Sequence, residues 1–186
     1  MTASTESARI TRRDWPRAAA FLLAGCGVVL AFAVFGLNGS GLVAALDIGV
    51  LVVLAWVDFD RRLLPNRIVL PSAAFVFAAQ VALAPGHALE LGAYALGTAL
   101  VLLLAYLVYP AGLGLGDVKL GLLLGASLGG AVVLGLLVGT LAAAAAAVAV
   151  LIREGSAGRK ASLPLGTFLA FGAIVALFVA QPPLAG

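Results

Sequence analysis

Charged residues are scarce in this chain. Asp, Glu, Lys and Arg make up 10% of its 186 residues, whereas 63% are hydrophobic and the mean hydropathy is +1.18. A soluble domain carries about 25% charged residues. The shortage therefore excludes an ordinary soluble domain and predicts an integral membrane protein rather than one held by a single anchor. No polar stretch is long enough to form a separate soluble domain.

Cysteine and histidine are equally scarce, with one of each, Cys26 and His87. A lone cysteine excludes an internal disulfide and a Cys-x-x-Cys metal site. We interpret Cys26, inside an apolar segment, as a small residue of a helix interface. Nothing near His87 in the sequence makes it a metal ligand or a general base. We therefore expect neither a metal nor another cofactor.

Long apolar segments account for most of the chain. A segment of roughly 20 apolar residues is needed to cross a bilayer as a helix. The sequence predicts an all-α integral membrane bundle of about seven transmembrane segments, with six or eight as alternatives. The fifth segment is too short to cross alone, so we expect it to tilt, to pack inside the bundle or to merge with the sixth. The predicted segments lie near residues 18–37, 42–57, 67–84, 88–109, 118–129, 131–152 and 163–181.

The basic residues segregate to alternate loops. The loops after the first, third and fifth segments, and the residues after the seventh, contain no Lys or Arg. By the positive-inside rule, residues 1–17 are predicted to be a cytoplasmic N-terminal tail, and the C-terminus lies outside. We attribute the net charge of +3 to topology and membrane lipid contacts, not to nucleic-acid binding. The eleven basic residues are Arg9, Arg12, Arg13, Arg17, Arg61, Arg62, Arg67, Lys119, Arg153, Arg159 and Lys160.

An Arg-rich start before an apolar run is also typical of a secretory signal peptide. The first segment is longer than the apolar part of such a peptide, and further segments follow it. We therefore expect an uncleaved membrane anchor.

The first of two short motifs that place carboxylates at segment ends is DFDRRLLPN, residues 58–66. An unpaired charge is costly at such a position. Pro65 prevents the loop from continuing as a helix, and Asn66 is predicted to cap a helix that begins at Arg67. The alternative is that Asp58 and Asp60 merely solvate the loop beside two arginines.

The second motif is GLGDVK, residues 114–119. Gly114 and Gly116 permit backbone conformations and close approaches that a side chain would block, and Lys119 could bind a lipid phosphate or influence a nearby carboxylate. Asp117 could instead be a helix cap in a Gly-rich turn. Because the predicted topology puts it on the same membrane face as Asp58, a joint role is favoured. Two aspartates brought together can perform acid–base peptide hydrolysis.

In this order, the motifs resemble those of the prepilin peptidases, membrane aspartic proteases of type IV pilus and related secretion systems. The segment LPLGTFLAFG, residues 163–172, is similar to the family's Pro-x-Gly-Pro-x-Leu segment, with Thr167 in place of the second proline. The resemblance covers residues 42–172. Its main motif residues are Asp58, Pro65, Asn66, Gly114, Gly116, Asp117 and Lys119.

The resemblance implies that residues 18–186 form a single membrane-embedded aspartic peptidase domain in the inner membrane. Asp58 and Asp117 would be catalytic, and the other five motif residues would support the site. The implied substrate is a prepilin or pseudopilin, whose short basic leader is cleaved after a glycine at the cytoplasmic face. Longer family members carry two Cys-x-x-Cys pairs associated with N-methylation. Because this chain has neither pair, a peptidase-only form is expected.

Two details concern the aspartates. Asp117 is expected at a helix N-terminus, which favours its charged form, whereas Asp58 is expected at a helix C-terminus. The sequence therefore predicts that Asp117 is the base. Asp47 lies eleven residues before Asp58 and, at about 100° per residue, on nearly the same helix face. It either bonds a neighbouring helix or has an accessory role in catalysis.

Other functions were weighed. Presenilin-like intramembrane proteases share Gly-x-Gly-Asp. They carry a Tyr-Asp motif on the preceding helix, however, where this chain has Val57-Asp58. A small cation or proton transporter would place its carboxylates near the bilayer midplane and interrupt the helices around them. A purely structural membrane subunit is the third alternative.

Overall fold

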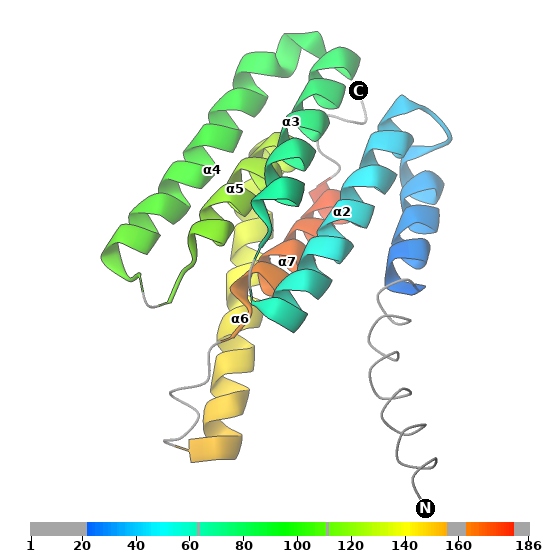
Figure 1. The fold of residues 1–186 in the computed structure, drawn as a ribbon. Helices are drawn as coiled ribbons and strands as arrows, with labels where there is room; N and C mark the ends of the chain where they lie inside the picture. Colours follow the sequence, from blue (N-terminus) through cyan, green and yellow to red (C-terminus); the bar gives the residue numbers. More distant parts are fainter. Residues whose placement is uncertain (1–21, 63, 111, 156–162, 181–186) are drawn as a thin grey trace, which may run out of the picture.

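The computed structural model describes residues 22–62, 64–110, 112–155 and 163–180, which are helical and contain no strand. This confirms the all-α class (Figure 1). The predicted tail, residues 1–17, and the basic residues Arg159 and Lys160 lie outside the described residues. The helices are Leu22–Phe35, α2 (Gly39–Arg61), α3 (Asn66–Leu83), α4 (Ala88–Val108), α5 (Leu115–Leu128), α6 (Val132–Glu154) and α7 (Leu165–Ala180), with 3-10 turns η1 (Pro85–His87) and η2 (Gly129–Ala131).

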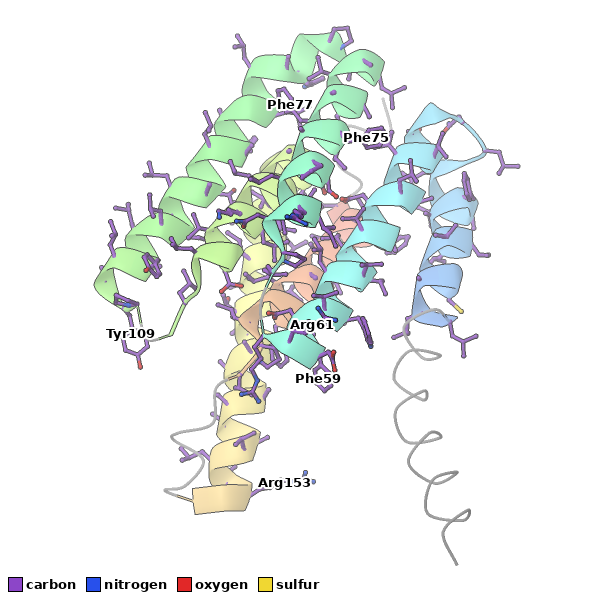
Figure 2. All side chains as sticks on the ribbon, viewed as in Figure 1. Phe59, Arg61, Phe75, Phe77, Tyr109 and Arg153 are labelled. Carbon is purple, nitrogen blue, oxygen red and sulfur yellow. The ribbon has the colours of Figure 1, made fainter. Side chains whose placement is uncertain are left out.

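Four stretches are long and apolar enough to cross a membrane: Gly39–Arg61, Asn66–Leu83, Pro85–Val108 and Leu115–Arg153. The helices Leu22–Phe35 and α7 are apolar but shorter. Large apolar side chains are exposed along the bundle, for example on α4 and α6, as a surface that faces lipid tails would be. Figure 2 shows many such side chains projecting outward from the ribbon. The count of seven crossings stays a prediction.

Helix α5 is the centre of the bundle. Nine of its 14 residues are buried, and it packs on α3 and α4 and also contacts α7. Helix α2 packs mainly on α7 and α3, and α6 packs on α7. The fifth segment therefore packs inside the bundle, one of the expected solutions. The turn η2 follows it, and Gly129 there has a φ of +52°, so α5 and α6 are separate helices.

Small residues let the helices approach closely, as is typical of packing in membranes. A Cβ atom at Gly125 of α5 would collide with the α4 backbone at Tyr94 and Ala95. A Cβ atom at Gly172 of α7 would collide in the same way with the α6 backbone at Gly135 and Gly139. At these positions the glycines serve close helix packing.

One end of the bundle gathers the described basic residues. The C-termini of α2 and α6 and the N-termini of α3, α5 and α7 all lie at the lower end in Figure 1. Figure 2 labels Arg61 and Arg153 there, with Phe75 and Phe77 toward the opposite end. Every described Lys and Arg belongs to these helix ends or to the residue just after α2: Arg61, Arg62, Arg67, Lys119 and Arg153.

We predict that Gly125→Ala lowers the free energy of unfolding by about 1–3 kcal/mol, because the added methyl group overpacks the α4–α5 contact. Gly97→Ala, on α4, is the matched control, since a Cβ there meets nothing within 4 Å. It should leave stability unchanged or raise it, because alanine is a better helix former. Thermal unfolding in detergent compares the two variants. Equal melting temperatures would contradict the packing role of Gly125.

Candidate active site

Asp58 lies in the last turn of α2 and is 6% exposed. The helix ends just beyond it because Arg62 adopts the left-handed conformation, with φ 52° and ψ 33°, a common way to terminate a helix. The Arg62 N–H donates to the backbone oxygen of Asp58 at 2.7 Å. The end of α2 therefore fixes the backbone that carries this carboxylate.

The N-terminus of α7 meets the Asp58 side chain. The backbone N–H of Thr167 donates to Asp58 Oδ2 at 2.9 Å, and the Thr167 hydroxyl lies 3.4 Å from the same oxygen while donating to the Ala55 carbonyl at 2.9 Å. Sequence reasoning treated Thr167 only as a departure from a proline. A proline would have no N–H to donate, so the departure permits this contact.

Asp117 lies in the first turn of α5 and is 8% exposed. The N-cap residue Gly114 donates its N–H to Asp117 Oδ2 at 2.9 Å, the reciprocal contact of a capping box. Asp117 thus takes part in capping α5, as one of the two interpretations of the sequence predicts. It also lines a pocket.

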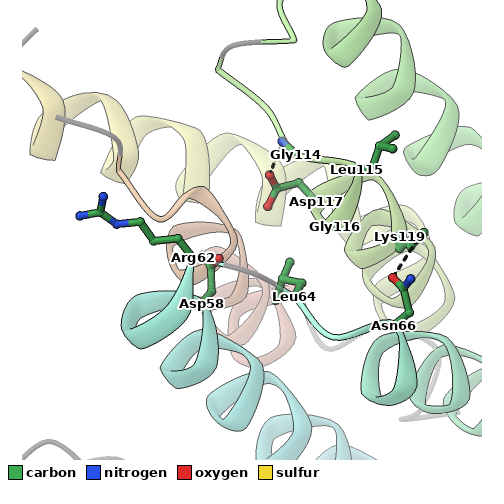
Figure 3. A pocket seen from close by; sticks show the side chains of 9 residues that line it. All are labelled: Asp58, Arg62, Leu64, Asn66, Gly114, Leu115, Gly116, Asp117 and Lys119. Carbon is green, nitrogen blue, oxygen red and sulfur yellow. Dashed lines mark hydrogen bonds between the residues drawn. The ribbon is translucent and has the colours of Figure 1, made fainter. Parts of the chain in front are cut away.

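The two aspartates line one pocket of about 310 Å³ at the basic end of the bundle. Figure 3 shows their side chains entering this pocket from different helices, and the two carboxyl groups interact electrostatically. The structure thus brings together the predicted pair, and four of the five predicted supporting residues line the same pocket. The pocket residues are Asp58, Arg62, Leu64, Asn66, Gly114, Leu115, Gly116, Asp117 and Lys119.

The prediction that Asn66 caps a helix starting at Arg67 is wrong. Helix α3 begins at Asn66 itself, and Pro65 is the N-cap residue, with φ −72° and ψ 121°. The Pro65 carbonyl accepts from the N–H groups of the first turn. The Asn66 side chain instead accepts a hydrogen bond from Lys119 Nζ at 2.8 Å, which ties α3 to α5 at the pocket. Pro65 does not line the pocket.

Leu64 is a pocket residue whose role was missed in the sequence. A Cβ atom at Gly116 would lie 3.0 Å from the Leu64 Cβ, and one at Gly166 would lie 3.0 Å from Leu64 Cδ1 and 2.9 Å from Asp58 Oδ2. Gly116 of α5 and Gly166 of α7 thus leave room for Leu64 and for the carboxyl group. Their glycine identity follows from packing around the aspartates.

The remaining candidates lie elsewhere. Asp60 is exposed and makes a surface pair with Arg61 at 3.9 Å, an arrangement that contributes little to stability. His87 is at the opposite end of α3 and α4 from the pocket, 3.0 Å from Glu90. Neither residue lines the pocket.

The prediction that Asp117 is the base took only Asp117 to lie at a helix N-terminus, but the N-terminus of α7 also reaches Asp58. Both carboxyl groups therefore accept a backbone N–H from a helix start. Helix N-termini therefore do not distinguish the two residues.

The comparisons with known proteins give one match. Residues 45–152 match the model of the type IV leader peptidase family. The matched range contains both aspartate motifs but not residues 163–172, where Gly166 and Thr167 lie. No curated protein and no solved structure gave a match to the chain.

Proposed function

The chain belongs to the type IV leader peptidase family, since the family model matches more than half of it, and we propose that it is a membrane aspartic endopeptidase that removes the short basic leader of prepilin-type proteins. The observation that carries this proposal is the meeting of Asp58 and Asp117, two nearly buried aspartates from different helices, in one pocket. Two carboxyl groups are sufficient for acid–base hydrolysis of a peptide bond.

In the proposed mechanism one carboxylate takes a proton from water, and the water oxygen attacks the scissile carbonyl carbon. The other carboxyl group, protonated, gives its proton to the carbonyl oxygen. Collapse of the tetrahedral intermediate breaks the C–N bond, and a proton passes to the leaving amine. No covalent enzyme intermediate forms. Sharing one proton suits two carboxyl groups in one site, because both do not readily ionise together.

Hydrogen bonds hold both carboxyl groups of the site in place. Each aspartate uses Oδ2 to accept a backbone N–H, from Thr167 or from Gly114. Both carboxyl groups also line the pocket, where water and substrate can reach them. Because the donors are backbone groups of helix starts, the carboxyl groups are positioned before substrate binds.

The substrate would approach from the cytoplasm. The pocket lies at the end of the bundle that carries the described Lys and Arg residues, which the positive-inside rule assigns to the cytoplasmic face. We propose about seven crossings of the inner membrane, with the N-terminus inside. The apolar helix of the prepilin or pseudopilin would stay in the membrane after cleavage.

The alternatives fit less well. The family match favours a leader peptidase over a presenilin-like intramembrane protease. A cation or proton transporter would place its carboxyl groups near the bilayer midplane. Asp58 and Asp117 instead occupy a last and a first helical turn at one end of the bundle.

The central test is cleavage of a prepilin-type protein with a basic leader, co-expressed with this chain. Asp58→Asn and Asp117→Asn should each lower the cleavage rate by about 10²–10⁴-fold, the usual size of an acid–base contribution. Asp60→Asn is the matched control and should cleave like the wild type, because Asp60 is exposed and outside the pocket. Leader removal that survives both substitutions would overturn the proposal.

A second prediction concerns Thr167. Thr167→Pro removes the N–H that binds Asp58, and proline is tolerated in the first turn of a helix. We expect kcat/KM to fall about tenfold, the effect of losing a hydrogen bond to a charged group. Thr167→Val keeps the N–H, so its kcat/KM should stay within about threefold of the wild-type value. Equal kcat/KM for the proline and valine variants, at matched melting temperatures, would contradict this role of the N–H.

A third prediction concerns topology. In a Cys26→Ala background, Arg153→Cys should resist a membrane-impermeant maleimide in intact spheroplasts and react after permeabilisation. His87→Cys, at the opposite end of the bundle, should react in intact spheroplasts. Both side chains are exposed in the structure. The reverse labelling pattern would place the pocket on the outer face.

A further inference from the structure

A second polar cluster is buried in the bundle, away from the pocket. Asp47 of α2 is 1% exposed, Ser127 of α5 is 1% exposed and Gln80 of α3 is 2% exposed. Polar groups at such depth in an apolar bundle are expensive and usually have a function. The acid–base mechanism at the pocket uses none of these three residues.

The cluster joins three helices. The Ser127 hydroxyl donates to Asp47 Oδ2 at 2.6 Å, and Gln80 Nε2 donates to the backbone oxygen of Ser127. Ser127 is in the last turn of α5, where helix carbonyls lack intrahelical partners. The other oxygen, Asp47 Oδ1, is buried and has no hydrogen-bond partner among the described residues. The expected hydrogen bond between Asp47 and a neighbouring helix, here α5, is therefore confirmed.

The two helices joined by this contact are the two that carry the pocket aspartates. Asp47 precedes Asp58 by eleven residues on α2, a rise of about 16 Å, and Ser127 follows Asp117 by ten residues on α5, a rise of about 15 Å. Helix α2 runs toward the pocket and α5 runs away from it. When Asp47 and Ser127 are level, Asp58 and Asp117 are therefore level as well.

Direct packing between α2 and α5 contributes little to this register. The two helices pack chiefly on α3, α4 and α7 rather than on each other. In lipid, interhelical hydrogen bonds are among the interactions that hold helices together, besides close packing. A slip of α5 by one residue would move Asp117 by about 1.5 Å.

We infer that Asp47 and Ser127 are positioning residues, whose hydrogen bond sets the axial register of α2 against α5 and so the placement of Asp58 relative to Asp117. The inference rests on the proposed peptidase function. Gln80 of α3 donates to the Ser127 backbone oxygen and so helps to hold the same end of α5 in place.

The first experiment measures cleavage kinetics. Asp47→Ala and Ser127→Ala should each lower kcat by about 10–100-fold with KM unchanged, because a misplacement of about 1 Å can cost about 10²-fold. The double variant should be no worse than the worse single variant, since both remove one interaction. Asp47→Asn keeps a hydrogen-bond partner for Ser127 and should restore kcat to within about threefold of wild type.

Thr140→Ala is the matched control for loss of a hydroxyl group. Among the described residues, the Thr140 hydroxyl donates to carbonyls of its own helix, at Leu136 and Leu137, so kcat should not change. Rates are compared well below the melting temperature of each variant and normalised to folded protein. A structural role alone would lower the melting temperature and leave the kcat of the folded enzyme unchanged.

The second experiment measures the register without activity. Spin labels at Phe59→Cys and Leu115→Cys, in a Cys26→Ala background, report the distance between the pocket ends of α2 and α5. Both positions are exposed. Ser127→Ala should shift or broaden the distance distribution, while Asp47→Asn and Thr140→Ala should leave it unchanged.

The outcomes separate the two proposals. If the wild type cleaves no prepilin-type substrate, the proposed function fails, and the label distances still test the positioning role. If Ser127→Ala changes neither kcat nor the distance distribution, the positioning role is overturned. It is also overturned if Asp47→Asn is as inactive as Asp47→Ala, because the carboxyl group itself, and not the hydrogen bond, would then be required.

Discussion

The structure depends on how an apolar bundle holds two carboxyl groups that are almost removed from water. Asp58 and Asp117 are 6% and 8% exposed, and a carboxylate at such a depth must be hydrogen-bonded to be tolerated. The donors here include backbone N–H groups at helix starts, Thr167 of α7 for Asp58 and the N-cap residue Gly114 of α5 for Asp117. Because helix starts carry N–H groups without intrahelical partners, the end of the bundle supplies donors for both carboxyl groups.

This requirement accounts for where the helices begin and end. Helix α2 stops just after Asp58, through the left-handed Arg62, and α7 starts beside it. The loop residue Leu64 fits between the two helix starts because Gly116 and Gly166 have no side chains. Gly116 and Gly166 are thus explained by space for Leu64 and the Asp58 carboxyl group.

Sequence reasoning reached the all-α class, the apolar segments and the aspartate pair, because hydropathy and short motifs are local signals. It missed the contacts that join residues far apart in the chain. Thr167 meets Asp58 across 109 positions and Ser127 meets Asp47 across 80, and no local pattern carries that information. The prediction for Asn66 is wrong for a local reason. Pro65 occupies the N-cap position, so the Asn66 side chain accepts a hydrogen bond from Lys119.

Two pairs of polar residues lie on α2 and α5. Asp58 and Asp117 line the pocket at one end of the bundle, whereas Asp47 and Ser127 are buried and bonded to each other. In water, apolar burial drives helices together, but lipid tails are as apolar as leucine. Polar contacts then carry much of the information about register. In the proposed peptidase, the hydrogen bond between Asp47 and Ser127, far along the same two helices, therefore fixes the level at which Asp58 and Asp117 meet.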